Sequence, residues 1–481
     1  MANEKLTYRA GDISLNACVL ISGQDELADI KRLVIEFNVF YDLFSSGINL
    51  QLVIGDSIGL IDSFPIVGDE TVLLSFKTPT LEKKSGVKFK DDLKFAFHIY
   101  KLTDRNRSSH RFETYTLHGI SHEVISNERK SVSKSYKDLP MRDIVADVYN
   151  NYLRPTNEEY RAYKSNKELN LQETKNTGYF AFTGNSPLKI INFLASESES
   201  LENTKSSNFV FFENNEGFNF VTLDSLLNAD PVEDMYYAFS KVEKDTTKDV
   251  IVGEEQTITS ISFKNQFNVL ENLQGGLYEH NVETLDPIRK IFKVDTFSYE
   301  NNFNDIAHIT PNKIYTGNSL FKKTGESSVS YNLISNIADD GVSYKESSEY
   351  FKLNDAISRD LQLRNPKVAH EFFKYNMASR LQLFNIALEI VVPGNSDIDV
   401  GKSVNIHVGQ ASQFKDLKEQ LSILFGEEGN NKFLITAVRH VYNTVDNNFF
   451  TVFECVKDTY GNNPEGTLRK TVSKELAELI L

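Results

Sequence analysis

The stretch LFNIALEIVVPGNSDIDVGKSVNIHV, residues Leu383–Val408, decides how the rest of the chain is interpreted. Apolar and polar residues alternate before Pro393-Gly394-Asn395, and the alternation resumes after Gly401. A period of two is typical of β-strands with one buried face, and a Pro-Gly-Asn sequence is typical of a turn. The stretch therefore predicts two strands that form an ordinary β-hairpin, and nothing in it suggests catalytic chemistry.

A similar pattern occurs near the other end of the chain, in INLQLVIGDSIGLIDSFPIVGDETVLLSF, residues Ile48–Phe76. Both segments contain a Gly followed by a polar residue before their second strand, at Gly68-Asp69 and Gly401-Lys402. Downstream, KFAFHIYKL and FETYTLHGI, from Lys94, resemble KFLITAVRH and FFTVFECVK, from Lys432. Any two antiparallel barrels could look alike at this level. However, order and spacing agree over four strands, which favours two copies of one antiparallel β-barrel.

The remaining patterns predict smaller α+β units around these barrels. Residues 1–128 contain short strands separated by polar turns, which is typical of a barrel or sandwich. Helices are expected after Asp138-Leu139-Pro140 and after Ser186-Pro187, and a hairpin around Asn214–Gly217. The predicted fold class is mainly β, with two similar antiparallel β-barrel domains plus two smaller α+β domains. The predicted division is 1–128 (first barrel), 129–228 (small α+β domain), 229–299 with 381–460 (second, split barrel), 300–380 (inserted loop-rich and helical domain) and 461–481 (linker and C-terminal helix).

Composition narrows the class of protein. The chain has 481 residues, of which 40% are hydrophobic and 25% charged, as in ordinary globular proteins. Its net charge of −15 makes it a poor general binder of nucleic acid, because phosphate is bound through Lys and Arg. Cys18 and Cys455 are too few for a disulfide framework or a zinc site. The N-terminus lacks a signal-peptide pattern and no apolar run could span a membrane, so a soluble protein made in a reducing cytoplasm is expected.

One motif suggests an enzyme. Gly55-Asp56-Ser57 resembles the nucleophile block of GDS-type esterases, and Asp305 and His308 have the Asp-x-x-His spacing of such enzymes. A catalytic Ser needs a base within hydrogen-bond reach. The residues after Ser57 are expected to lead into another strand rather than a helix, without an α/β pattern around them. A serine esterase is therefore the weakest of the alternatives.

Metal and phosphate chemistry also have weak support. His118 and His122 stand four residues apart, which suits metal ligands on a helix, but His118 falls in a predicted strand. Gly275-Gly276 is expected to be a turn, and the pairs Glu254-Glu255 and Glu427-Glu428 are expected to be solvated. The sequence thus predicts no catalytic, cofactor-binding or metal-binding residue, and no cofactor.

Three segments resemble one family when taken in their order along the chain. LIDSFPIVGDETVLLSFKTP (Leu60–Pro79), followed by FHIYKLTDR and YTLHGIS, resembles the N-terminal barrel of baseplate hub proteins of contractile-tailed bacteriophages of the T-even type. The expected helix 139–152 and FVFFENNEGFNFVTLDSLL (Phe209–Leu227) resemble that family's second domain. Leu383–Val408 with FLITAVRHVYNTVDNNFFTVFECVKD (Phe433–Asp458) resembles its second barrel. The extra length in residues 300–380 and the C-terminal tail depart from the family pattern.

The resemblance implies a structural virion protein without enzymatic activity. It implies a homotrimer whose six tail-tube-like barrels match the hexameric tail tube on one side and the trimeric central spike on the other. The remaining partners would be baseplate wedge proteins, and DNA would pass through the lumen during tail contraction without specific binding and without membrane insertion of the hub. The expected location is the phage tail baseplate, after synthesis in the host cytoplasm. The alternative is the hub part of a type VI secretion or phage-like injection spike, whose β-helical spike would here be a separate protein.

Overall fold

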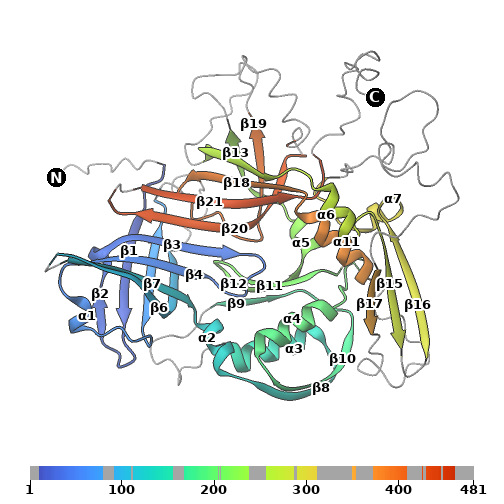
Figure 1. Cartoon of the computed structure of the whole chain (residues 1–481), viewed down its shortest axis with the longest axis horizontal. Helices are drawn as coiled ribbons and strands as arrows, with labels where there is room; N and C mark the ends of the chain where they lie inside the picture. Colours follow the sequence, from blue (N-terminus) through green and yellow to red (C-terminus); the bar gives the residue numbers. More distant parts are fainter. Residues whose placement is uncertain are drawn as a thin grey trace, which may run out of the picture.

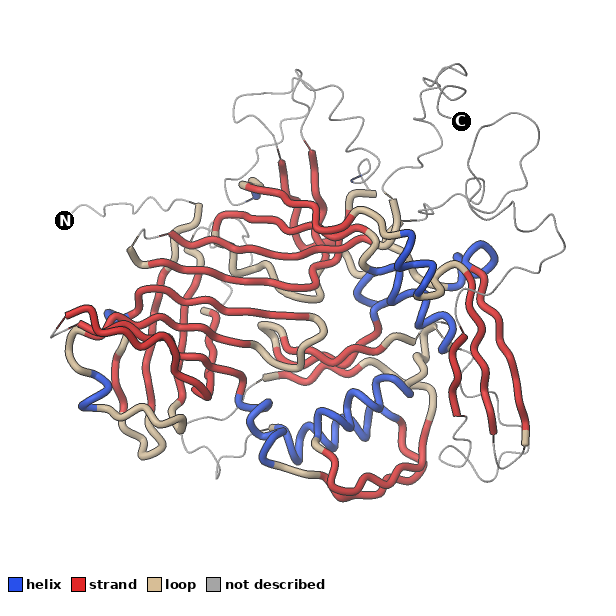
Figure 2. The backbone as a smooth tube through the Cα atoms, in the orientation of Figure 1, coloured by secondary structure: helices blue, strands red, loops and turns tan. Residues whose placement is uncertain are grey.

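The prediction of a mainly β chain is confirmed by the structure (Figure 1, Figure 2). The structure, a computed structural model, describes residues 10–79, 92–109, 112–154, 167–203, 205, 207–237, 256–286, 290–310, 349–353, 372–408, 425, 430–445 and 448–460. The described strands form one 13-stranded sheet, one two-stranded sheet and two three-stranded sheets. The predicted C-terminal helix in 461–481 lies outside the described residues.

The large sheet is built from the two ends of the chain. Its N-terminal strands are β1 (Ser14–Ile21), β2 (Leu27–Asp29), β3 (Val34–Asp42), β4 (Asn49–Asp56), β5 (Thr71–Lys77), β6 (Leu93–Ser109) and β7 (Phe112–Ser121), with the short helices η1 (Lys31–Leu33) and α1 (Leu60–Ser63). Its C-terminal strands are β13 (Pro231–Tyr237), β14 (Ser260–Asn265), β18 (Ile386–Pro393), β19 (Ser403–Val408), β20 (Lys432–Asn443) and β21 (Asn448–Lys457). We call these two sets the N-terminal half and the C-terminal half. Pairing between β3 and β20 makes the sheet continuous through both halves, where two separate barrels were expected.

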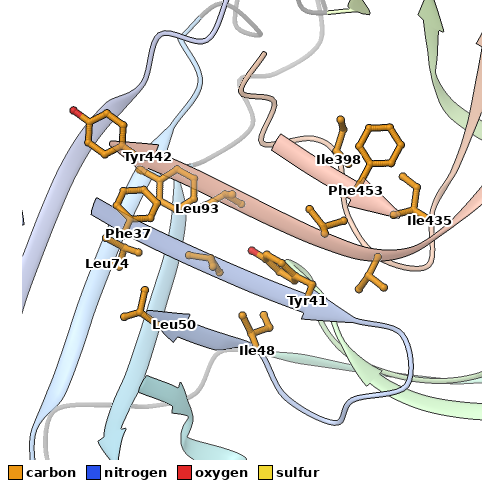
Figure 3. Close-up of a cluster of buried hydrophobic side chains, with 14 of the residues drawn as sticks. Phe37, Tyr41, Ile48, Leu50, Leu74, Leu93, Ile398, Ile435, Tyr442 and Phe453 are labelled. Carbon is orange, nitrogen blue, oxygen red and sulfur yellow. The ribbon is translucent and has the colours of Figure 1, made fainter. Parts of the chain in front are cut away.

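One hydrophobic core packs against the large sheet and contains side chains from both of its halves (Figure 3). Phe37 and Phe76 of the N-terminal half lie 5.1 Å apart between ring centroids, and Phe76 lies 5.9 Å from Phe449 of the C-terminal half. All three rings are fully buried. Burial of a large apolar side chain stabilises the fold by roughly 1.5–3 kcal/mol, so this shared core holds the two halves together.

A second unit packs two helices between small sheets (Figure 1). Its elements are α2 (His122–Arg129), β8 (Val132–Pro140), α3 (Met141–Val148) with the π-helical turn η3 (Tyr149–Leu153), β9 (Glu168–Leu171), β10 (Thr177–Asn185), α4 (Pro187–Glu197), β11 (Phe209–Glu213), β12 (Gly217–Thr222) and α5 (Leu223–Asn228). As predicted, β11 and β12 form a hairpin and Pro187 opens α4. Both faces of the hairpin are buried: Phe212 belongs to the core of the large sheet and Phe211 to the core around α3 and α4.

A third unit lies beside the C-terminal half. It contains α6 (Val269–Gln274), β15 (Glu279–Asp286), β16 (Ile291–Ser298), α7 (Tyr299–Asn302), η5 (Phe303–Asp305), β17 (Glu349–Leu353) and α11 (Phe373–Leu383). β15 pairs with β16 on one side and with β17 on the other, and none of these three described strands pairs with the large sheet. Of the range 229–299, predicted to belong to the second barrel, β13 and β14 lie in the large sheet and β15 and β16 in the separate three-stranded sheet.

The predicted hairpin in Leu383–Val408 is wrong. β18 and β19 are both strands, but β18 pairs with β14 and β21, whereas β19 pairs with β13 and β20. Local alternation sets which face of a strand is buried but not which strand is its neighbour. The residues after Pro393 therefore carry the chain across the sheet instead of reversing it.

Candidate functional site

The join between β3 and β20 is the feature on which the large sheet depends. The two strands pair antiparallel from Glu36 opposite Asn443 to Asp42 opposite Ala437. β20 has two partners along one edge, because Lys432–Leu434 pair with β19 and Ala437–Asn443 pair with β3. The change of partner coincides with a bulge between Ile435 and Ala437 in the pairing of β20 with β21. A bulge bends its strand, so β20 can leave one neighbour and meet another.

The two halves have the same strand connectivity. Four strands of the N-terminal half are arranged in the order β4-β7-β6-β5, and four of the C-terminal half in the order β18-β21-β20-β19. In both halves, therefore, the first of the four strands along the chain lies at one end and is followed across the sheet by the fourth, the third and the second. These are the four strands for which the sequence indicated a repeat. The outer neighbours also correspond, since β3 pairs with β4 as β14 pairs with β18.

The correspondence extends to single residues. Ile99 lies opposite Gly119 in β6 and β7, and Ile435 lies opposite Cys455 in β20 and β21. In each pair of strands a bulge follows at once, at Tyr100 in the first half and at Thr436 in the second. The inward-facing residues match as well, all 0–2% exposed: Ile48 directly before β4 with Leu50, Leu52 and Ile54 of β4, and Ile386, Leu388, Ile390 and Val392 of β18.

Buried polar groups surround the join. His440 of β20 is fully buried, its Nδ1 lies 3.0 Å from Oγ1 of Thr451, and burial lowers its pKa to about 3. Tyr41 of β3 donates from its hydroxyl to Oδ1 of Asn215, 2.7 Å away, in the β11–β12 turn. Asn215 in turn donates its backbone N–H to Asp399, 3.0 Å away, so the turn contacts both halves at once. Burial, then Asp399 and Glu213, raise the pKa of Tyr41, which keeps its hydroxyl a donor.

A buried ion cluster, which no sequence pattern predicts, lies where α2, β9 and β11 meet. Nζ of Lys167 lies 2.7 Å from Glu123 and 2.5 Å from Glu213, and both carboxylates are 1–2% exposed. Glu213 also accepts a hydrogen bond from the backbone N–H of Ile48, 3.1 Å away, directly before β4. Burial, opposed by Lys167, raises the pKa of Glu213, while the two carboxylates outweigh burial and raise the pKa of Lys167. The cluster therefore ties the α+β unit to the N-terminal half.

The esterase motif forms no catalytic arrangement within the described residues. Ser57 lines a hollow of about 210 Å³ whose other walls are Asp56, Ile58, Gly59, Ile61, Asp62, Arg105, Arg107, Phe112 and Glu113, with no histidine among them. His308 lies elsewhere, with Nδ1 2.6 Å from Asp458 and Nε2 2.8 Å from the carbonyl of Phe303. The expected strand after Ser57 is wrong, because Gly59 turns the chain into the one-turn helix α1. The carboxylate of Asp56 accepts a hydrogen bond from the backbone N–H of Ile58, 3.0 Å away, in this turn.

The two histidines considered as metal ligands have separate surroundings. Nε2 of His118, on β7, lies 2.8 Å from Oγ1 of Thr103, and Nε2 of His122, at the start of α2, lies 3.3 Å from Oγ1 of Thr71. Burial lowers the pKa of His122 to about 4, so its ring is neutral. No group of three or more potential ligands occurs in the part of the chain that the structure describes.

The remaining candidates are structural or lie outside the described residues. Cys18 and Cys455 are both fully buried, and burial raises the pKa of Cys18 to about 12 and that of Cys455 further still. Gly276 has a positive φ of 78° and ends the turn after α6, as expected. Glu254-Glu255 and Glu427-Glu428 lie outside the described residues. Among the described helices, none has the length and apolar character needed to cross a membrane.

Comparison with known proteins gave structural but not sequence matches. No protein-family model matches the sequence, and no curated protein matches it. The structure is similar to a tail protein from Neisseria meningitidis MC58, with 10% identity, a TM-score of 0.48, and coverage of 92% of this chain and 96% of that one. It is similar to the 43 kDa tail protein of prophage MuSo2 from Shewanella oneidensis, with 8% identity, a TM-score of 0.47, and coverage of 92% and 98%. An Escherichia coli component of the type VI secretion system is similar at 9% identity and a TM-score of 0.35, with coverage of 96% and 81%.

Proposed function

We propose that this chain is a structural hub of a contractile-tail baseplate, in which three copies form a ring of six similar half-sheets. Such a ring presents sixfold symmetry to a hexameric tail tube and threefold symmetry to a trimeric spike. DNA would leave through the lumen during contraction, and the hub would itself perform no catalysis. Its place would be the tail baseplate of the virion, where wedge proteins would surround it.

The observation that carries the proposal is the residue-level repeat. The strand orders β4-β7-β6-β5 and β18-β21-β20-β19, with bulges at Tyr100 and Thr436, are those expected of one domain present twice. A duplicated domain is what a threefold assembly needs in order to offer six equivalent positions. The resemblance of the sequence to baseplate hubs supports the same role, and so does the net charge of −15, since an acidic lumen would not retain DNA.

The test is the mass and shape of the purified chain in solution. Light scattering should give about three times the chain mass of 54.7 kDa at micromolar concentration. Averaged electron micrographs of the same sample should show a ring with six lobes around a central opening. A chain that stays at 54.7 kDa over this concentration range, with or without a trimeric spike protein, would overturn the proposal.

A further inference from the structure

We propose that the edge of β14 with which no described strand pairs meets the outer part of β6 in a second copy, repeating between chains the β3–β20 join within the chain. This inference deepens the proposed function, since it names the strands through which hub subunits would meet. It rests on four observations: strand equivalence, edge availability, exposure and register.

The first observation is that β14 and β6 are the counterparts of β3 and β20. β14 flanks β18 as β3 flanks β4, with Ile261 opposite Ile390 and Phe37 opposite Leu52. β6 pairs with β5 and β7 as β20 pairs with β19 and β21. The join therefore uses a β3-type strand from one half and a β20-type strand from the other. Each chain has one further strand of each type.

The second observation is that these two further strands have open edges among the described residues. β20 leaves β19 at its bulge and pairs with β3, whereas β6 leaves β5 after His98 and the same edge then has no strand partner within the described ranges. β14 pairs with β18 on one side. On its other side, only the residues just before it are bridged, where Thr257 pairs with Tyr236 of β13. An open edge exposes backbone N–H and C=O groups that another strand can pair with.

The third observation is that equivalent positions differ in exposure. Val39 of β3 is fully buried at the join, while its counterpart Phe263 of β14 is 41% exposed. Thr436 at the bulge of β20 is 4% exposed, while its counterpart Tyr100 is 51% exposed. Each ring has one contact within its own chain, Phe263 with Phe425 at 6.1 Å and Tyr100 with His118 at 6.2 Å between ring centroids. A second copy at this edge would bury the part of each ring that remains exposed.

The fourth observation fixes the register of the expected pair. In the join, Asn38 lies opposite Val441. Ser262 lies opposite Glu389 as Asn38 lies opposite Gln51, so Ser262 is the counterpart of Asn38. Counted along the neighbouring strands β7 and β21, Asn106 lies opposite Thr114 as Val441 lies opposite Phe450, so Asn106 is the counterpart of Val441 beyond a second bulge of β6, between Thr103 and Asn106, that β20 lacks. Ser262 of one copy should therefore face Asn106 of the next, and both residues are exposed in the single chain.

The pairing is of the heterologous type, because the two edges differ. A heterologous contact that is repeated must either close into a ring or continue as a filament. Within one chain, the β3–β20 pairing already links one half-sheet to the next. With each copy adding two halves and one new join of the same kind, three copies complete the six half-sheets of the proposed ring.

Disulfide crosslinking tests the inference in the full-length chain. Ser262→Cys and Asn106→Cys are made singly, and the two single variants are mixed and oxidised with copper phenanthroline. The mixture should give a covalent dimer on a non-reducing gel, and the double variant should give dimer and trimer bands. The native Cys18 and Cys455 are buried and should not react. Pairing Asn106→Cys with Val445→Cys, whose native side chain is 77% exposed, is the matched control and should give no dimer.

Three outcomes are distinguishable when the same samples are examined by light scattering. Crosslinking of the 262–106 pair well above that of the 445 control supports the β14–β6 contact. A trimer in solution without this crosslink overturns the edge pairing and leaves the hub proposal intact. A chain that is monomeric and does not crosslink overturns both.

Discussion

Arg439 of β20 donates a hydrogen bond from Nε to Oδ1 of Asn38 on β3, over 3.0 Å. The guanidinium also lies over the ring of Phe40, 5.3 Å from its centroid. The amide nitrogen of Asn38, which is buried, donates to Glu36 at 2.8 Å. Side chains 401 positions apart in the sequence thus reinforce the backbone pairing that joins the two halves.

Asn38→Ala should lower the free energy of unfolding by about 1–3 kcal/mol, because the variant loses the charge-assisted hydrogen bond from Arg439 and the bond that the buried amide donates to Glu36. Urea denaturation followed by circular dichroism measures the loss. The matched control is Ser262→Ala at the equivalent position of β14, which is exposed and should change stability by no more than about 0.5 kcal/mol. Equal losses of stability in the two variants would show that the Asn38 side chain at the join contributes no more to stability than an exposed side chain at the equivalent position.

Lys167→Met should cost about 3–5 kcal/mol at pH 8, because Glu123 and Glu213 would then face each other buried and without a cation. The pKa of Glu213 is raised in the folded chain. The folded state therefore binds a proton at pH values where the unfolded state does not, and the deficit should shrink as the pH falls from 8 towards 5. Denaturant midpoints across this range measure the effect.

Lys205→Met is the control for this variant. Lys205 pairs with Asp305 at 2.6 Å on the surface and is 54% exposed, so its removal should cost less than about 1 kcal/mol at every pH. If the loss in free energy of unfolding of Lys167→Met stayed constant with pH, protonation of Glu123 or Glu213 would not be what stabilises the variant at low pH.

His440→Leu should make the chain less sensitive to acid. Burial lowers the pKa of His440 to about 3 in the folded chain, whereas an unfolded His has a pKa of about 6.5. Stability from this residue is thus fully present above pH 6.5 and is lost as the pH falls towards 3, at up to about 1.4 kcal/mol per unit. The melting temperatures at pH 7 and at pH 4.5 should therefore differ less in the variant than in the wild type. An unchanged difference would exclude His440 as the acid-sensitive group.

Gly394→Ala should destabilise the C-terminal half by about 1–3 kcal/mol through overpacking. A Cβ at this position would lie 1.8 Å from Cδ1 of Phe449, whose ring is buried 5.9 Å from that of Phe76. The double variant with Phe449→Ala removes the clashing ring atoms, so its loss should be smaller than the sum of the single losses. Calorimetric melting of the four chains in this cycle measures the coupling, and additive losses would contradict the clash.

Much of the fold was predictable where local pattern and burial agree. The alternation at Ile48–Ile54 and at Ile386–Val392 identified the inward faces correctly, because a period of two places alternate side chains on one face. The β11–β12 and β20–β21 hairpins were predictable from their turn residues. The cluster of Lys167, Glu123 and Glu213 was not, because these charged residues come from three separate segments and each alone looks like a solvated side chain.

The sequence by itself determined the β class of the chain, the repeat of four strands and the residues that face inward, because these depend on local periodicity. Only the tertiary structure decided which strands are neighbours. β18 and β19, adjacent in the sequence, have no pairing with each other, while β3 and β20 pair across nearly the whole chain. Backbone hydrogen bonding is the same for every strand, so the choice of partner depends on bulges, shared core packing and side-chain contacts such as Arg439 with Asn38.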